Sequence, residues 1–230
     1  MAVLLKWMLA AALAVAVTAC ENKGKEERQA PTPVQTTAPT VPEQINDTRL
    51  VIAAFGDSLS AGLGLDPGQT YPDDLQRLID AAGYRYRVVN MGVSGDTTTD
   101  GVERLPSVLA AHPAVVILEF GANDGLRGQP VALSKQNLAK MIEALRQSGA
   151  RVLLAGMTLP RNYGPDYIHA FEQIFPELAK QYKLVRIPFL LDGVGGNAKL
   201  TQPDGLHPTA EGAAIVAHTV MQYLQPMLKK

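Results

Sequence analysis

Four short segments of the 230-residue chain combine residue types that catalyse acyl transfer. Serine can supply a nucleophile, histidine a base and aspartate a group that orients the base, while glycine and asparagine can supply N–H donors to an oxyanion. In chain order the segments are Gly56-Asp57-Ser58-Leu59-Ser60, Gly92-Val93-Ser94-Gly95-Asp96, Gly121-Ala122-Asn123-Asp124 and Asp204-Gly205-Leu206-His207-Pro208. If the fold brings these segments together, they contain the parts of a serine hydrolase site.

Short runs rich in valine, isoleucine and leucine predict the strands that position these segments. The runs are Leu50–Phe55, Arg87–Asn90, Ala114–Phe120, Val152–Ala155 and Leu184–Ile187. The first, third and fourth are almost continuously apolar, which is typical of parallel strands covered on both faces. Sites on parallel sheets gather just beyond the carboxyl ends of the strands, so we expect the four segments to converge on one edge.

Apolar residues at helical spacing predict crossover helices between the strands. The patterns cover Leu75–Ala82, Leu138–Leu145, Phe171–Leu178 and Val216–Leu224, with a weaker helix over 98–111. We expect Pro106 to interrupt the weaker helix and Pro176 to kink or split the helix that contains it. Strands joined by such helices predict an α/β fold, with a doubly wound parallel sheet and helices on both faces.

Ser58, Asp204 and His207 are the candidate catalytic triad. Ser58 follows a buried strand and stands between small residues that expose its side chain, which favours a nucleophile, although serine is also a preferred helix N-cap. The spacing of Asp204 and His207 lets both side chains project from one turn, so the carboxylate can bind Nδ1 and leave Nε2 for Ser58. The alternative is a turn aspartate followed by a solvent-facing histidine. Asp57 is interpreted as bracing the turn.

Position along the chain also distinguishes functional from structural interpretations of Asn123 and of the other three histidines. Asn123 lies just beyond a buried strand, which favours a side-chain amide donor to an oxyanion over a turn-forming asparagine. His112 precedes Pro113 at the end of a predicted helix, and His169 and His218 lie within predicted helices. Packing or capping is therefore the simpler interpretation of those three histidines.

Composition indicates a globular protein and excludes several classes. The chain is 47% hydrophobic and 19% charged with a net charge of −1, which excludes collagen, coiled coil and disorder throughout. Because a nucleic-acid binder would carry a basic surplus, no nucleic-acid partner is expected. Four of the 21 basic and five of the 22 acidic residues precede Arg49, so the rest is neutral, which suits an uncharged or amphiphilic substrate. One cysteine and four histidines without zinc-like spacing predict no metal site.

The first residues have the pattern of a bacterial lipoprotein. Lys6 precedes a run of thirteen residues, 7–19, that is apolar except for Thr18. A membrane-spanning helix needs about 20 residues, so the run predicts a signal peptide over 1–19. Its end, Val17-Thr18-Ala19-Cys20, resembles a lipobox, in which Cys20 carries the lipid, although ordinary cleavage after Ala19 is an alternative.

A linker is predicted to follow the lipidated cysteine. Residues 31–42 contain four prolines and four threonines, so residues 20–48 should form a semi-extended spacer before a catalytic domain over 49–230. The predicted location is the bacterial cell envelope, on the periplasmic side. Glu21 would not retain the protein at the inner membrane under the enterobacterial sorting pattern, which points to the outer membrane.

Taken together, the four segments resemble the SGNH (GDSL) hydrolase family, and most closely its thioesterase I, lysophospholipase and arylesterase branch. Leu159-Pro160-Arg161-Asn162-Tyr163-Gly164 also resembles that branch. The resemblance implies a flavodoxin-like three-layer sandwich with sheet order 2-1-3-4-5. It implies an oxyanion hole made by the N–H groups of Ser58 and Gly95 and the Asn123 amide, with Gly92 as the rival of Gly95, and no metal or organic cofactor.

The sequence therefore predicts a monomeric serine esterase that hydrolyses acyl esters, thioesters or lysophospholipids through an acyl-enzyme. An esterase that removes acetyl groups from envelope polysaccharide is the alternative, and a non-catalytic anchored binding module is a third possibility. The module would be expected to lack the catalytic serine, histidine or asparagine, all of which are present. An acyl groove could be lined by apolar residues that would equally suit core packing, namely Leu59, Leu63, Leu65, Met157 and Leu159.

Overall fold

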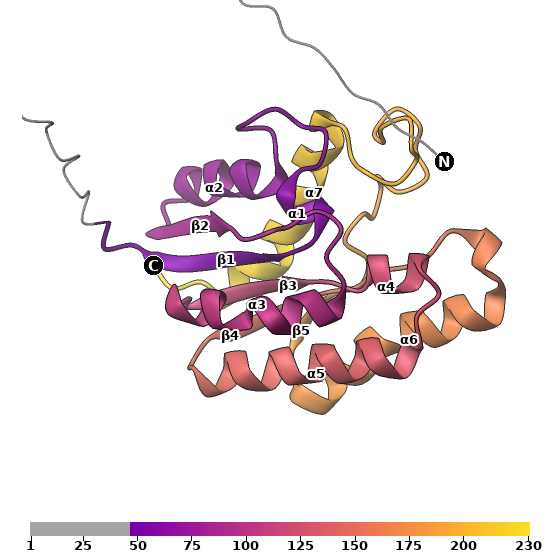
Figure 1. The fold of residues 1–230 in the computed structure, drawn as a ribbon. Helices are drawn as coiled ribbons and strands as arrows, with labels where there is room; N and C mark the ends of the chain where they lie inside the picture. The colour runs from indigo at the N-terminus through magenta and orange to yellow at the C-terminus, as the bar shows by residue number, and fades with distance from the viewer. Residues whose placement is uncertain (1–46) are drawn as a thin grey trace, which may run out of the picture. The chain divides into compact units, whose positions relative to one another are not determined.

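Five parallel strands form a sheet in the order β2-β1-β3-β4-β5 (Figure 1). The strands are β1 (Leu50–Gly56), β2 (Tyr86–Asn90), β3 (Val115–Glu119), β4 (Arg151–Ala155) and β5 (Val185–Ile187). They belong to a computed structural model that describes residues 47–230, so the predicted signal peptide, Cys20 and nearly all of the predicted linker lie outside the described residues. The sheet order confirms the flavodoxin-like expectation, and each strand end lies within one residue of its predicted position.

Helices cover both faces of this sheet. They are α1 (Ser58–Ala61), α2 (Tyr71–Ala81), α3 (Thr98–Ala110), α4 (Ala122–Leu126), α5 (Val131–Gln147), α6 (Pro165–Tyr182) and α7 (Ala210–Leu224), with short 3₁₀ turns at Arg161–Tyr163 and Gln225–Met227. α2 packs beside α7 on one face, and α5 packs between α3 and α6 on the other (Figure 1). Within residues 47–230, no helix is long and apolar enough to cross a membrane.

The two central strands are sealed from solvent. Every residue of β3 is buried, and in β1 only Leu50, at the amino end, is exposed. Their carboxyl ends are in register, with Gly56 opposite Glu119. The Phe55 and Phe120 rings meet edge to face, with centroids 4.8 Å apart, just beneath this edge. The positions at which β1 and β3 end are therefore fixed by packing on both faces.

Two helices differ from the sequence-based expectation because of their prolines. The prediction that Pro106 interrupts its helix is wrong, since α3 continues from Thr98 to Ala110, and Pro176 does not split α6. Each proline removes one intrahelical hydrogen bond. In α3 the loss is offset by a capping box between Thr97 and Asp100 and by a buried apolar face. Because Pro106 is on the exposed side of the helix, water can hydrate the carbonyl that it leaves unpaired.

Candidate active site

Ser58 lies where β1 ends, as the first residue of the short helix α1. Its Oγ is 2.8 Å from Nε2 of His207, and the residue is largely buried, with 8% of its surface exposed. The alternative interpretation of Ser58 as a helix N-cap is wrong, because the cap is Asp57, whose Oδ1 accepts the N–H of Leu59 at 3.0 Å. The hydroxyl of Ser58 is therefore free to face the histidine.

Asp204 and His207 project from one turn ahead of α7, as the sequence predicts. Asp204 Oδ2 is 2.6 Å from Nδ1 of His207, and Oδ1 accepts the backbone N–H groups of Leu206 and His207. Although desolvation alone would raise it, these hydrogen bonds lower the pKa of Asp204 to about 2. The ionised carboxylate requires a proton on Nδ1, which leaves Nε2 of a neutral ring to accept the Ser58 hydroxyl.

Gly95 and Asn123 line the same cavity as Ser58 and His207. Gly95 has a φ of +88°, a conformation that favours glycine. Gly92 is less suited to the oxyanion, because its N–H already donates to Oδ1 of Asn90 at 2.9 Å. It also packs so closely against the backbone of Ala61 that a Cβ would lie 2.2 Å from that residue's nitrogen.

The Asn123 amide is oriented by two acceptors. Asn123 belongs to α4, a helix that the sequence analysis did not predict, and its Nδ2 donates to Asp57 Oδ2 at 3.1 Å and to the Asp96 carbonyl at 2.9 Å. Asp57 thus braces the turn, as expected, and in addition contacts the amide. A substrate oxyanion would have to share one of the two amide hydrogens with its present acceptor.

A second carboxyl group, Glu119, is buried beneath the nucleophile turn. Its Oε2 accepts the Asp57 N–H at 3.1 Å and the Ser60 hydroxyl at 2.8 Å, and no donor among residues 47–230 reaches Oε1. Burial raises the pKa of Glu119 well above its usual range, and the nearby Asp57 charge raises it further. Burial also raises the pKa of Asp57, to about 6, although the N–H of Leu59 opposes this rise by stabilising the Asp57 charge. We therefore assign a proton to Glu119 and the negative charge to Asp57.

A cavity of about 780 Å³ opens beside Ser58 and is mainly apolar. Of the residues predicted to form an acyl groove, Leu59, Leu63, Met157 and Leu159 line it, and Leu65 does not. Met157 and Leu159 are also part of the hydrophobic core, which confirms the core-packing interpretation for these two residues. The sequence analysis missed further apolar lining residues, namely Leu126, Ile168, Phe189, Leu191 and Leu206.

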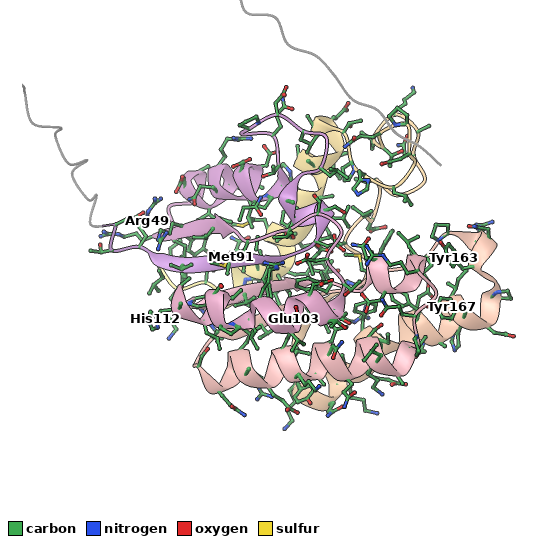
Figure 2. All side chains as sticks on the ribbon, viewed as in Figure 1. Arg49, Met91, Glu103, His112, Tyr163 and Tyr167 are labelled. Carbon is green, nitrogen blue, oxygen red and sulfur yellow. The ribbon has the colours of Figure 1, made fainter. Side chains whose placement is uncertain are left out.

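Two tyrosines connect the cavity wall to α4. The hydroxyl of Tyr163 donates to the carbonyl of Leu126 at 2.7 Å, and that of Tyr167 donates to the carbonyl of Gln129 at 2.8 Å. Figure 2 labels both side chains beside α4. These bonds join the segment after β4 to the segment that carries Asn123.

The remaining histidines do not line the cavity beside Ser58. His112 lies two residues beyond α3 with a φ of +46°, His169 lies within α6, and the ring of His218 hydrogen-bonds through Nδ1 to the Ala214 carbonyl one turn earlier in α7. Within residues 47–230, no group of three or more histidine, cysteine, aspartate or glutamate side chains could hold a metal ion.

The sequence matches a known family over residues 54–215, that of the GDSL-like lipases and acylhydrolases. Esterase TesA of Pseudomonas aeruginosa is 47% identical over 178 residues, which cover 77% of this chain and 89% of that protein. An arylesterase of Vibrio mimicus is 39% identical, covering 75% and 87%. The thioesterase 1/protease 1/lysophospholipase L1 of Escherichia coli K12 is 36% identical, covering 79% and 85%.

The fold comparison agrees with the sequence comparison. A crystal structure of TesA superposes with a TM-score of 0.75 at 46% identity, covering 77% of this chain and 99% of that one. The chain belongs to the GDSL-like lipase/acylhydrolase family. It is a serine ester hydrolase.

The buried pair of carboxyl groups makes a prediction about pH and stability. If Glu119 is neutral in the folded chain, the folded state binds one more proton than the unfolded state once the pH exceeds the ordinary glutamate pKa of about 4.3. As the pH rises further, Glu119 then lowers the free energy of unfolding by up to about 1.4 kcal/mol per pH unit, until the pH reaches the raised pKa of Glu119. Glu119→Gln removes that dependence, so its stability relative to the wild type should increase from about pH 5 to about pH 7.

Urea denaturation of both proteins across this pH range measures the difference. Glu103→Gln, which removes an exposed carboxyl on α3 that is labelled in Figure 2, is the matched control and should follow the wild type. A constant difference between Glu119→Gln and the wild type would show that Glu119 is ionised in the folded protein.

Proposed function

We propose that the chain hydrolyses acyl esters and thioesters through an acyl-enzyme formed on Ser58. The observation that carries this proposal is the distance of 2.8 Å between Ser58 Oγ and His207 Nε2, with Asp204 on the opposite nitrogen and an apolar cavity beside them. A hydroxyl aligned on an oriented neutral imidazole is the arrangement that activates a serine nucleophile.

The proposed reaction begins when Ser58 Oγ attacks the carbonyl carbon of the substrate. His207 Nε2 takes the hydroxyl proton, and the Asp204 carboxylate stabilises the resulting imidazolium. The negative charge on the carbonyl oxygen is stabilised by the N–H groups of Ser58 and Gly95 and by the Asn123 amide. His207 then returns the proton to the departing alcohol or thiol. Water, deprotonated by His207, attacks the acyl carbon, releases the acid and restores the Ser58 hydroxyl.

The proposed substrates carry an acyl chain that occupies the cavity. A volume of about 780 Å³ is within the range of sites that enclose whole small-molecule ligands, far more than an acetyl group fills. The names of the relatives, an esterase, an arylesterase and a thioesterase/lysophospholipase, support the same substrate class. The size of the cavity favours it over removal of acetyl groups from a polysaccharide.

The proposed location is the bacterial cell envelope, with the enzyme attached through lipid on Cys20. The support is the apolar run over 7–19 and the lipobox-like end at Cys20, both read from the sequence. One acyl chain gives weak and reversible membrane binding, and several give stable anchoring. An envelope lipoprotein of this type would meet acyl lipids where it is anchored.

Ser58→Ala should abolish hydrolysis while the protein folds normally, because it removes the nucleophile and little else. The expected loss in kcat is on the order of 10³–10⁶. The assay is a panel of p-nitrophenyl esters from acetyl to palmitoyl, with acyl-CoA and lysophospholipid. Ser134→Ala, which removes a buried hydroxyl that donates to Asp124, is the matched control.

Several outcomes of this panel would contradict the proposal. Activity above a tenth of the wild type in Ser58→Ala would remove Ser58 from the mechanism. A wild type that hydrolyses only acetyl esters would favour the polysaccharide deacetylase, and one with no activity would favour a binding module.

Asn123→Ala should lower kcat far more than it raises KM, because the amide binds the oxyanion of the transition state more strongly than the neutral carbonyl. Removing one such donor typically costs about 10²–10³ in kcat. Asn137→Ala is the matched control, since its buried amide likewise donates to two oxygens, those of Thr98 and Thr99. Steady-state kinetics on p-nitrophenyl butyrate and a thermal melt should be recorded for both. If Asn123→Ala merely lowers Tm, the asparagine is a turn former.

Cys20→Ala should move the enzyme out of the membrane fraction and leave its activity per molecule on short soluble esters unchanged. The physical reason is that the lipid, and no catalytic group, is lost. Fractionation and mass spectrometry of the mature N-terminus measure the outcome. An unmodified wild-type N-terminus would show that the signal peptide is removed by ordinary cleavage.

A further inference from the structure

Arg104, on α3, contacts three segments at the carboxyl edge of the sheet. Its Nη2 donates to the Gly56 carbonyl at 3.1 Å, its Nη1 to the Met91 carbonyl at 3.0 Å and its Nε to Asp96 Oδ2 at 2.5 Å. The acceptors lie at the end of β1, just beyond β2, and in the loop that leads into α3. One planar guanidinium therefore joins the end of β1 to the stretch between β2 and α3, through the carbonyls of Gly56 and Met91 and the side chain of Asp96.

Two of these segments border groups of the proposed oxyanion hole. Gly56 lies two residues before Ser58, and Asp96 directly follows Gly95. The carbonyl of Asp96 also accepts the Asn123 amide at 2.9 Å. A shift of Arg104 would therefore displace both backbone donors and the side-chain donor together.

The surroundings of Arg104 favour a geometric role over a direct electrostatic one. The guanidinium carbon lies 5.0 Å from the centre of the Phe55 ring and 5.9 Å from that of Phe120, and both rings are fully buried. The Arg104 side chain is 27% exposed and that of Asp96 is 13% exposed. The Asp96 carboxylate neutralises the arginine charge at short range, so little net field reaches the reacting oxygen.

The geometry also requires arginine in place of lysine. Arginine presents five N–H donors in a rigid planar fork that can stack on aromatic rings, and this fork is what allows three acceptors in different directions to be met. A lysine ammonium would keep the charge and could pair with Asp96, but it could not stack on the rings and reach both carbonyls.

We propose that Arg104 is a positioning residue that sets the separation of the Ser58 and Gly95 N–H groups and the orientation of the Asn123 amide. This inference rests on the proposed function, and it adds the residue that holds the three donors where the oxyanion of the transition state needs them. Arg104 does not line the cavity beside Ser58. Its effect on catalysis acts through the backbone that it joins.

The test compares Arg104→Met, Arg104→Lys and the wild type in the full-length protein. Active sites are first titrated with a fluorophosphonate, so that kcat is expressed per intact nucleophile. Misplacement by about 1 Å can cost about 10²-fold in rate, so we expect Arg104→Met to lower kcat by about 100-fold and Arg104→Lys by about tenfold. KM for p-nitrophenyl butyrate should change by less than about threefold, because the acyl cavity is unaffected.

Inhibition by butylboronic acid provides a second readout, because its tetrahedral adduct with serine places an oxygen in the oxyanion hole. Its Ki should rise in each variant by about the factor by which kcat falls. Arg77→Met is the matched control. Arg77 lies on α2 and, like Arg104, binds both a carboxylate (Asp74) and a backbone carbonyl (Gly68). It should keep the wild-type kcat and Ki.

Two results would overturn the proposal. One is a kcat per titrated site within about threefold of the wild type in Arg104→Met, whatever fraction of the protein is folded. The other is full recovery by Arg104→Lys, which would assign the effect to charge. Failure of the proposed function itself would appear in the wild type, which would neither hydrolyse the ester nor react with the fluorophosphonate.

Discussion

The central strands β1 and β3 are covered by helices on both faces, so their backbone groups must pair with neighbouring strands until each strand ends. At the carboxyl edge this pairing stops, and the next few residues become available to a site. Because Gly56 and Glu119 are opposite each other in the register, the residues after β1 and β3 emerge side by side. The proximity of Ser58 to Asn123 thus follows from the packing of residues that take no part in chemistry.

The same edge contains more buried carboxyl groups than the proposed reaction uses. The carboxyl groups of Asp57, Glu119 and Asp124 are all fully buried. Asp124 accepts hydrogen bonds from the N–H and hydroxyl of Thr98 and from the Ser134 hydroxyl, so it ties the start of α3 to α5. An unpaired buried charge is costly, and the structure limits that cost by saturating Asp124 with donors and by leaving Glu119 with its proton.

Sequence reasoning located the strands and the candidate groups around Ser58, because those signals are local or repeat along the chain, whereas the sheet order came from the family resemblance. Buried strands appear as unbroken apolar runs, and Asp204 and His207 are close in sequence. Arg104 and Glu119 had no such signal, since Arg104 binds the carbonyls of Gly56 and Met91 and Glu119 binds Asp57 and Ser60, all of them more than ten positions away. α4 was missed because five residues beginning with Ala122 contain no helical period to detect.

Pro106 shows the opposite limitation. Proline disfavours the interior of a helix, yet α3 continues through Pro106 because Leu105 and Val108 are buried against the rest of the core. Packing supplies more free energy than the one hydrogen bond that proline removes. The continuity of α3 has a consequence for the site, since Arg104 lies only two residues before the proline and depends on that helix for its position.

The two hydrogen bonds of the Asn123 amide bear on its proposed role as a donor to the oxyanion. In the absence of substrate one amide hydrogen is bonded to the Asp57 carboxylate, so the donor is already oriented before any negative charge develops. In the proposed mechanism an oxyanion competes with Asp57 for that hydrogen, and the exchange replaces one negative acceptor by another. Asp57 can give up the bond because it still accepts the Leu59 N–H. A carboxylate at position 119 would instead add a second negative charge beneath the oxyanion and oppose the step that the amide assists.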